Sequence, residues 1–312
     1  MKKIYFIDTV HSILEEKLSG AGYVCLDLTK EKKENIQGLV FDAYGLVIRS
    51  RITLNEDFLK SIDHLKFIAR SGSGLENIDV EFCHKKQIEV YNSPEGNKDA
   101  VAEHCLGMLI ALLNNFKGAH KDLINGAWNR EKNRGTEITS QRVAIIGYGH
   151  NGKAFAQRLR SLGVEVLVYD KYKSGFASEG IHECSLDEIF LNATVISFHV
   201  PLTQETSYMA DYQFFKSFVN PVYVLNISRG GVLKTSELIQ AMDKEIVLGA
   251  GLDVLDEESK SFDVEKANET ITNLNQRPNV ILTPHVAGWT KESYYKLSLV
   301  LAEKVINQKS PQ

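Results

Sequence analysis

The chain has 312 residues, more than the roughly 100 to 200 of a usual single domain, so two domains with separate cores are expected. With 43% hydrophobic and 24% charged residues, the composition is that of an ordinary globular protein and excludes a disordered or fibrous one. The net charge of −4, without a basic block, excludes the electrostatic footprint that nucleic acid or a membrane surface requires.

The N-terminal apolar run, residues 4–7, is too short for a secretion signal or a membrane span. We therefore expect a cytoplasmic protein. The cysteines form no CxxC pair and no histidine stands at metal-ligand spacing from them, so we expect reduced structural thiols and no metal site. These cysteines are Cys25, Cys83, Cys105 and Cys184.

Short β-rich runs alternate with helical patterns through the first hundred residues. Such alternation is typical of a parallel sheet covered by helices on both faces. It predicts one small, flavodoxin-like α/β domain. The predicted strands are 3–7, 23–26, 46–48, 67–69 and 89–91, and helical patterns at 11–18 and 55–62 lie between them.

Residues 100–113 are apolar on nearly every side of a helix, except at Glu103 and His104. This is typical of a helix buried on several faces. We expect it at a domain or subunit interface, and the sequence leaves these two alternatives open.

A second series of strands follows, and its number fits a Rossmann-type, doubly wound parallel sheet. The strands are 143–146, 165–169, 195–199, 222–226, 247–252 and 280–282. The last segment has apolar residues three to four positions apart, from Tyr294 to Val305, which predicts an amphipathic helix that returns to the first domain. The predicted α/β domains are 1–98 with 289–312, and 99–288, with a cleft between them.

Residues 147–152 read GYGHNG, a GxGxxG pattern that directly follows the strand 143–146 and leads into a helix. Gly147 permits the tight turn, and Gly149 lets the backbone approach a pyrophosphate. Gly152 lets the helix pack close to the strand. The N-terminus of that helix then faces the phosphates of a dinucleotide.

Asp170 ends the next strand, 18 residues after Gly152. A carboxylate at this place accepts hydrogen bonds from the adenosine ribose and repels a 2′-phosphate, which predicts NAD as the cofactor. Lys171 and Lys173 follow and offer NADP an alternative partner, but the carboxylate at the strand end dominates.

Polar side chains follow three later strands. In an open α/β sheet, ligands bind outside the carboxyl ends of the strands, so Arg229, Glu258 and His285 should converge there with Asp253. The segments are 226–231 (NISRGG), 251–254 (GLDV) with the acid at 258, and 283–288 (TPHVAG).

These segments, together with 199–203 (HVPLT), resemble the D-isomer-specific 2-hydroxyacid dehydrogenase family over nearly the whole chain. The sequence is closest to two-domain D-3-phosphoglycerate dehydrogenases that lack a C-terminal regulatory domain, for which we expect no room in the 24 residues after Gly288. The resemblance implies an NAD-dependent oxidoreductase that acts on D-2-hydroxy acids, with a small-molecule substrate, and a homodimer.

The resemblance also implies roles for single residues. Arg229 binds the substrate carboxylate and polarises the C2 oxygen, and His285 is the acid/base, a task that suits a group titrating near neutrality. Glu258 orients His285. Glu257 remains a rival, because Ser259 stands where the family usually has a proline.

For the cofactor, the resemblance implies contacts from the Gly-rich turn and from the ends of the later strands, with Asp253 against the nicotinamide. The expected contacts are Gly147, Gly149, His150, Asn151, Gly152, Asp170, Val200, Pro201, Ile227, Ser228, Asp253 and Gly288.

For the substrate, residues 70–79 resemble the family's carboxylate-binding loop, in which backbone N–H groups of Ser73 and Gly74 face the substrate. Arg49 and Arg51 follow the strand 46–48, and a similar Arg-Ser-Arg segment occurs in 3-phosphoglycerate dehydrogenases, where arginine helps to hold the phosphate. Because alternating residues point to opposite sides, one of the two arginines is expected to face away.

The sequence thus predicts conversion between 3-phosphoglycerate and 3-phosphohydroxypyruvate, as in serine biosynthesis. Reduction of hydroxypyruvate or glyoxylate is the alternative within the same class. A non-catalytic NAD-binding partner protein is the alternative of another class, and the presence of Arg229, Glu258 and His285 counts against it.

Overall fold

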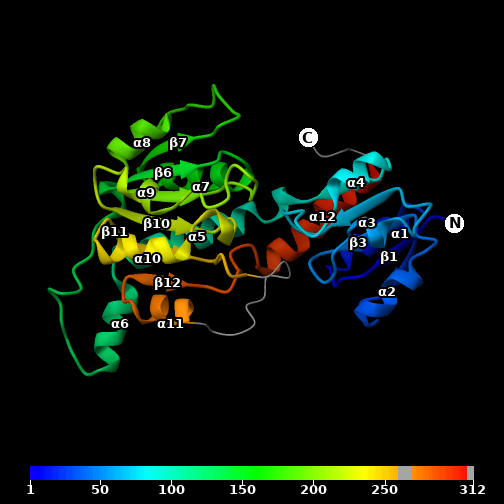
Figure 1. Ribbon diagram of the computed structural model, residues 1–312, viewed down its shortest axis with the longest axis horizontal. Helices are drawn as coiled ribbons and strands as arrows, with labels where there is room; N and C mark the ends of the chain where they lie inside the picture. The colour runs from blue at the N-terminus through cyan, green and yellow to red at the C-terminus, as the bar shows by residue number, and fades with distance from the viewer. Residues whose placement is uncertain (259–268, 308–312) are drawn as a thin grey trace. The chain divides into compact units, whose positions relative to one another are not determined.

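The computed structural model describes residues 1–258 and 269–307, which form two compact units, each built on its own parallel sheet (Figure 1). The first domain consists of 1–98 with 289–307, and the second of 99–258 with 269–288. The end of the predicted segment 289–312 lies outside the described residues. No helix in the described ranges is long and apolar enough to cross a membrane.

The first domain has five parallel strands in the order β2-β1-β3-β4-β5, the flavodoxin-like arrangement. All five lie within one residue of the predicted runs at either end. The strands are β1 (Lys3–Phe6), β2 (Val24–Asp27), β3 (Gly45–Ile48), β4 (Phe67–Arg70) and β5 (Glu89–Asn92).

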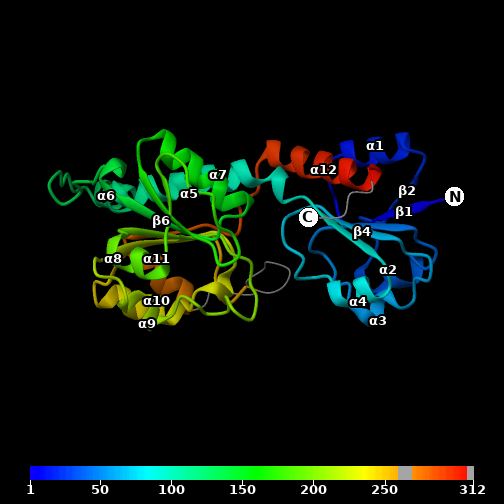
Figure 2. The same cartoon turned by 90° about the horizontal axis from the view of Figure 1, so that it is seen from above.

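Helices cover both faces of this sheet (Figure 2). Ile4 and Phe6 pack with α1 and with Leu301 of α12, whereas Tyr5 and Ile7 belong to the core on the other side. Both faces are apolar because both are buried, as parallel sheets require. The helices are α1 (Ile13–Gly20), α2 (Lys33–Leu39), α3 (Glu56–Leu59), α4 (Val80–Lys85), the 3-10 turn η1 (Pro94–Gly96) and α12 (Lys291–Ile306).

The second domain has seven parallel strands in the order β12-β11-β10-β9-β6-β7-β8. The strand order reverses between β6 and β9, which is the switch point of a Rossmann-type sheet. The six predicted strands are present. They and one further strand are β6 (Arg142–Ile146), β7 (Glu165–Tyr169), β8 (Ile181–Glu183), β9 (Val195–Phe198), β10 (Val222–Asn226), β11 (Val247–Leu252) and β12 (Val280–Leu282).

The strand β8 was not predicted. It has three residues, lies at the edge of the sheet and buries the side chain of Ile181 alone, so it has no apolar alternation to detect. Its pairing with β7 makes it a strand.

Helices also cover both faces of the second sheet. Val143 and Ile145 pack towards α5 and α7, and Ala144 and Ile146 face the opposite layer. The helices are α5 (Lys98–Leu113), α6 (Phe116–Ile124), α7 (His150–Ser161), α8 (Leu186–Asn192), α9 (Tyr212–Lys216), α10 (Thr235–Asp243) and α11 (Glu269–Gln276), with 3-10 turns η2 (Ile138–Ser140) and η3 (Gly230–Val232).

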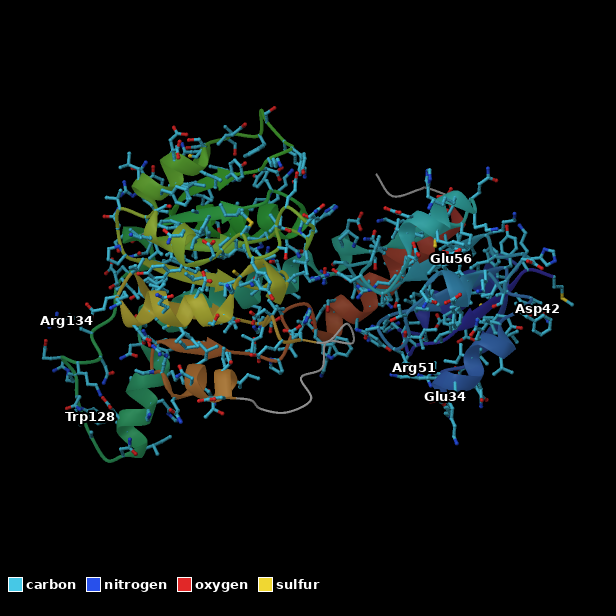
Figure 3. The ribbon with its side chains drawn as sticks, viewed as in Figure 1. Glu34, Asp42, Arg51, Glu56, Trp128 and Arg134 are labelled. Carbon is cyan, nitrogen blue, oxygen red and sulfur yellow. The ribbon has the colours of Figure 1, made fainter. Side chains whose placement is uncertain are left out.

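The helix α5 is apolar all round largely because it is buried in the core of the second domain, beside α7 and the sheet. Exposed apolar side chains gather instead on α6 and just after it. Trp128 is 80% exposed and Ile124 70% exposed, and Figure 3 shows Trp128 in the segment that follows α6.

Candidate active site

The Gly-rich turn after β6 has the shape that a dinucleotide needs. Gly147 has φ of 96°, in the left-handed region, and a Cβ there would lie 2.7 Å from the carbonyl oxygen of His199. A Cβ on Gly152 would lie 2.1 Å from the carbonyl oxygen of Gly147. A Cβ on Gly149 meets nothing within 4 Å, so the space over its backbone is open for a ligand.

The first turn of α7 is built to receive an anion. Gly149 is its N-cap, no side chain caps the helix, and its first turn has no acidic residue. The buried Oδ1 atom of Asn151 has no hydrogen-bond partner in the described structure. The N–H groups at the start of a helix and the positive end of its dipole favour phosphate, so this turn fits NAD.

Asp170 follows β7 and ties the turn together. Its Oδ2 accepts a hydrogen bond from Tyr148 N–H at 2.7 Å, and its Oδ1 accepts from the N–H groups of Tyr172 and Lys173 at 3.0 and 3.1 Å. A carboxylate has about four lone-pair sites, so capacity remains for a ribose hydroxyl.

The two lysines that offered NADP an alternative are engaged elsewhere. Lys171 Nζ lies 2.7 Å from Glu205 Oε1, and Lys173 Nζ donates to the carbonyl of Tyr148 at 2.9 Å. Both contacts leave less positive charge for a 2′-phosphate.

His199, at the end of β9, is a buried histidine. Its Nε2 lies 2.8 Å from Ser197 Oγ, which in turn lies 3.4 Å from Cys105 Sγ. Burial lowers the pKa of His199 to about 3, so the ring is neutral near pH 7 and does not exchange protons there.

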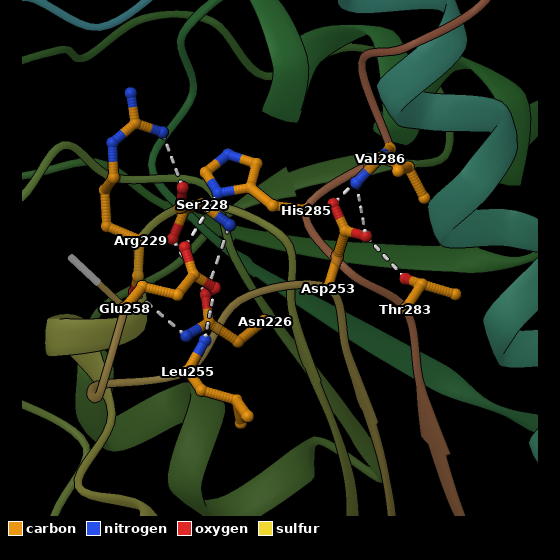
Figure 4. A network of polar contacts seen from close by, with 10 residues as sticks. Asn226, Ser228, Arg229, Asp253, Leu255, Glu258, Thr283, His285 and Val286 are labelled. Atoms are coloured by element: carbon orange, nitrogen blue, oxygen red, sulfur yellow. Dashed lines mark hydrogen bonds and ion pairs between the residues drawn. The ribbon is translucent and has the colours of Figure 1, made fainter. Parts of the chain in front are cut away.

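The turn after β10 is shaped by a buried asparagine. Asn226 Oδ1 accepts hydrogen bonds from the N–H and the hydroxyl of Ser228, at 3.2 and 2.9 Å. Its Nδ2 donates to the carbonyl of Arg229 at 3.0 Å. Figure 4 shows this network, and the guanidinium of Arg229 also donates to the Ser228 carbonyl, at 2.6 Å.

Glu258 and His285 form a direct pair. Glu258 Oε2 lies 2.8 Å from His285 Nδ1, and Glu258 Oε1 accepts from Leu255 N–H at 2.7 Å (Figure 4). The carboxylate is therefore fixed by a backbone group on one side and holds the imidazole on the other. It is Glu258 that reaches His285, which favours it over its rival Glu257.

The turns that carry Arg229 and Glu258 lie against one another. A Cβ on Gly230 would lie 1.8 Å from the carbonyl oxygen of Leu255, so this close approach requires glycine. The structure thus brings together the three residues predicted to be catalytic.

Asp253 is 1% exposed and holds the segment that carries His285. Its Oδ1 accepts from Val286 N–H at 2.9 Å and its Oδ2 from Ala287 N–H at 2.8 Å. Its carbonyl oxygen accepts from His285 N–H at 2.8 Å. The hydroxyl of Thr283 donates to Oδ1 at 2.5 Å.

The other residues predicted to contact NAD follow the carboxyl ends of the same strands, where the topology places a ligand. Val200 and Pro201 follow β9, Ile227 and Ser228 follow β10, and Gly288 ends the segment after β12, while His150 and Asn151 start α7.

In the parts of the chain with described positions, no group of three or more His, Cys, Asp or Glu residues is placed to hold a metal ion.

In the first domain, Arg49 and Arg51 have different surroundings. Arg51 donates from its guanidinium to the carbonyls of Ile7, Leu28 and Glu31. These contacts connect the loops after β1 and β2 and use donors that an anion would need. The phosphate role predicted for Arg51 finds no support in these contacts. Its labelled side chain appears in Figure 3.

The guanidinium of Arg49 instead lies 4.0 Å from the centre of the Trp289 ring, and the Arg49 N–H donates to Asp8 at 2.5 Å. No described residue accepts a hydrogen bond from this guanidinium. Burial lowers the pKa of Arg49, and the charge of Asp8 offsets this in part. A poorly hydrated cation with unused donors favours an anionic ligand.

The loop after β4 holds Ser73 and Gly74. Ser73 donates from its hydroxyl to Asn97 Oδ1 at 2.9 Å, and its carbonyl accepts from Asn92 Nδ2 at 2.7 Å. Asn77 ties the same loop to the turn after β3, because its Nδ2 donates to the carbonyl of Arg49 at 3.0 Å. A hydrogen bond thus joins the turn after β3 to the loop after β4, the two segments predicted to bind the substrate.

The sequence reasoning missed Asn226, Thr283 and His104 as parts of this site. Asn226 and Thr283 lie inside segments that were noted, but their roles as internal acceptor and donor depend on which backbone groups come near. His104 Nε2 lies 2.9 Å from Thr283 Oγ1. No local signal in the sequence joins residues so far apart.

Residues 106–287 match the family described as "D-isomer specific 2-hydroxyacid dehydrogenase, NAD binding domain". The chain is 30% identical over 286 residues to a hydroxypyruvate reductase of Thermotoga maritima, covering 91% of each chain. It is 31% identical over 265 residues to a D-3-phosphoglycerate dehydrogenase of Archaeoglobus fulgidus, covering 84% of this chain. It spans about half, 49%, of the length of that relative.

Among solved structures, a D-lactate dehydrogenase of Aquifex aeolicus in complex with NAD and lactic acid superimposes with a TM-score of 0.82. The two chains are 26% identical, and the match covers 97% of this chain and 94% of the other. The D-2-hydroxyisocaproate dehydrogenase structure matches with a TM-score of 0.84 at 22% identity and so supports the fold. The chain therefore belongs to the NAD-dependent D-isomer-specific 2-hydroxyacid dehydrogenases.

Proposed function

We propose that this dehydrogenase interconverts 3-phosphoglycerate and 3-phosphohydroxypyruvate, the reaction that leads into serine biosynthesis. The observation that carries this proposal is Arg49, whose guanidinium stacks on Trp289 and has no acceptor among the described residues. A phosphate dianion fits such a group because the planar fork of arginine binds two oxygens at once.

In the first domain, a carboxylate-binding role is proposed for the backbone N–H groups of Ser73 and Gly74. In the second domain, the same role is proposed separately for Arg229. Within the described structure these two N–H groups have no acceptor. Successive amides in a Gly-rich turn suit an anion, and a bidentate arginine fixes its orientation.

His285 is the proposed acid/base. Glu258 only accepts hydrogen bonds, so Nδ1 of His285 must carry the hydrogen that they share, and Nε2 is the nitrogen that exchanges a proton with the C2 oxygen of the substrate. Glu258 holds the imidazole in place through its contact with Nδ1 while Nε2 exchanges the proton. Bound NAD supplies the hydride chemistry at C2.

Reduction of hydroxypyruvate is the second candidate, and two observations favour it. The hydroxypyruvate reductase of Thermotoga maritima matches over 91% of both chains. Arg51 is occupied by three carbonyls, so a single arginine of the predicted pair remains for a phosphate. The alternative of a non-catalytic NAD-binding protein is set aside, because the family is one of dehydrogenases and the Glu258–His285 pair is formed.

The substrate is tested with NADH and equal concentrations of phosphohydroxypyruvate, hydroxypyruvate, glyoxylate and pyruvate, followed by loss of absorbance. We expect phosphohydroxypyruvate to have the highest kcat/KM. Arg49→Ala should then lower kcat/KM for phosphohydroxypyruvate about 30-fold or more, since a charge-assisted hydrogen bond to a phosphate contributes about 2 kcal/mol, and should change that for hydroxypyruvate little.

Arg49→Lys is the matched variant that keeps the charge and should recover part of the loss. An equal loss for both substrates would refute a phosphate-specific role of Arg49. Preference of the unmodified enzyme for hydroxypyruvate would decide for the second candidate.

Glu258→Gln should lower kcat about 10- to 100-fold, because a neutral amide is a weaker hydrogen-bond acceptor for Nδ1 and positions the acid/base less firmly. Glu257→Gln, a change of the same kind one residue earlier, should stay close to the unmodified enzyme. Steady-state kinetics at saturating NADH measures both. A larger effect of Glu257→Gln would transfer the positioning role to Glu257.

Asp170→Asn should weaken NADH binding about tenfold, because a charged acceptor for the ribose is lost. NADPH binding should suffer less, since the charge that repels its phosphate is also lost. Asp187→Asn, an exposed carboxylate in the first turn of α8, is the control. Fluorescence titration with both nucleotides checks this, and unchanged NADH affinity would contradict the role of Asp170.

We also propose a homodimer that buries the apolar side chains on and after α6. Leu123 is 53% exposed and Trp128 80% exposed, an unusual gathering for a surface that meets only water. Sedimentation velocity should give about twice the chain mass of 35.0 kDa. Leu123→Glu with Trp128→Glu should give the monomer, whereas Leu191→Glu on α8 should not, and a monomeric unmodified protein would end this proposal.

A further inference from the structure

His104 is one of the few polar residues on the largely apolar helix α5, and it contacts the residue that follows β12. Its Nε2 lies 2.9 Å from Thr283 Oγ1 and 3.7 Å from Asp253 Oδ1. The imidazole is 24% exposed and the Asp253 side chain 1% exposed. All three residues belong to the second domain.

The direction of the hydrogen bonds follows from the number of protons. The Thr283 hydroxyl has one proton and donates it to Asp253 Oδ1 at 2.5 Å. Its oxygen can therefore only accept from His104, so Nε2 of His104 carries a hydrogen. Two consecutive hydrogen bonds therefore run in one direction, from His104 to Thr283 and from Thr283 to Asp253.

Asp253 controls the backbone at His285. Its carboxylate accepts from the N–H of Val286 (Figure 4) and from the N–H of Ala287. Its carbonyl accepts from the N–H of His285. His285 itself has φ of 54°, in the left-handed region that non-glycine residues seldom adopt. Such a conformation persists only where surrounding contacts hold it, and Asp253 supplies three of them.

A buried carboxylate needs a full set of donors in fixed places. The Thr283 hydroxyl is one of these donors. A hydroxyl can rotate, and a second hydrogen-bond partner fixes its direction. His104 is that partner. Among the described residues it is also the basic side chain within ion-pair distance of Asp253.

We propose that His104 is a positioning residue for catalysis: by fixing the Thr283 hydroxyl on Asp253 it keeps the strained His285 turn aligned with Glu258. The inference rests on the proposed function, which makes His285 the acid/base. His104 acts through Thr283 and Asp253 and touches neither the substrate nor the proton that is transferred.

The test replaces His104 by Leu, which removes the donor, and by Gln, whose amide nitrogen can occupy the place of Nε2. His104→Leu should lower kcat about 10- to 100-fold, because a small misplacement of the acid/base has effects of this size. KM and the fluorescence-measured Kd for NADH should stay within about twofold. His104→Gln should recover most of kcat. His64→Leu, at an exposed position before β4, is the matched control.

Thr283→Val tests the hydrogen-bond path from His104 through Thr283 to Asp253. It should reduce kcat as His104→Leu does, and the double variant should lose no more than either single variant, because both break one path. Losses that multiply, a kcat of His104→Leu equal to that of the control, or failure of Gln to restore activity would each overturn the proposal.

His285→Asn separates this inference from the proposed function. If His285→Asn is inactive while His104→Leu is fully active, the positioning role fails and the acid/base assignment stands. If His285→Asn keeps full activity, the acid/base assignment itself fails. Nitrogen-15 spectra of histidine-labelled protein should also show the His104 ring with its proton on Nε2, and a proton on Nδ1 alone would contradict the direction of the two hydrogen bonds.

Discussion

The buried carboxylate of Asp253 is the constraint around which the second half of the site is arranged. An ionised group removed from water costs several kcal/mol unless donors surround it. Two backbone N–H groups after His285 and the Thr283 hydroxyl supply them. Because those donors belong to the segment that carries His285, satisfying the carboxylate also fixes the course of that segment.

The parallel sheet of the second domain explains why distant residues meet at all. Parallel strands have their carboxyl ends at one edge, so the segments after β6, β7, β10, β11 and β12 lie along that edge. The Gly-rich turn takes the switch point, and the turns of Arg229 and Glu258 pack together through Gly230. The first domain repeats the principle, with Arg49 and the Ser73 loop after neighbouring strands.

Much of the fold could be predicted from the sequence, because apolar periodicity records burial. The strands β6, β7, β9 and β10 bury both faces and give near-continuous apolar runs. β8 gave no such signal, since it buries one side chain. α5 was correctly expected to be buried on several faces, yet the sequence did not distinguish burial in the domain's own core from an interface.

What the sequence by itself determined is the set of local rules: a Gly-rich turn between strand and helix, an acid at the end of the next strand, and polar residues after later strands. What only the tertiary structure decided is how each side chain is used. Arg49 and Arg51 share one local pattern, but the carbonyls that accept from Arg51 come from two separate segments, one after β1 and one after β2. The contact of His104 with Thr283 joins positions 179 residues apart. Spacing along the chain governs turns and periodicity, whereas hydrogen-bond partners depend on distances that exist only after the chain has folded.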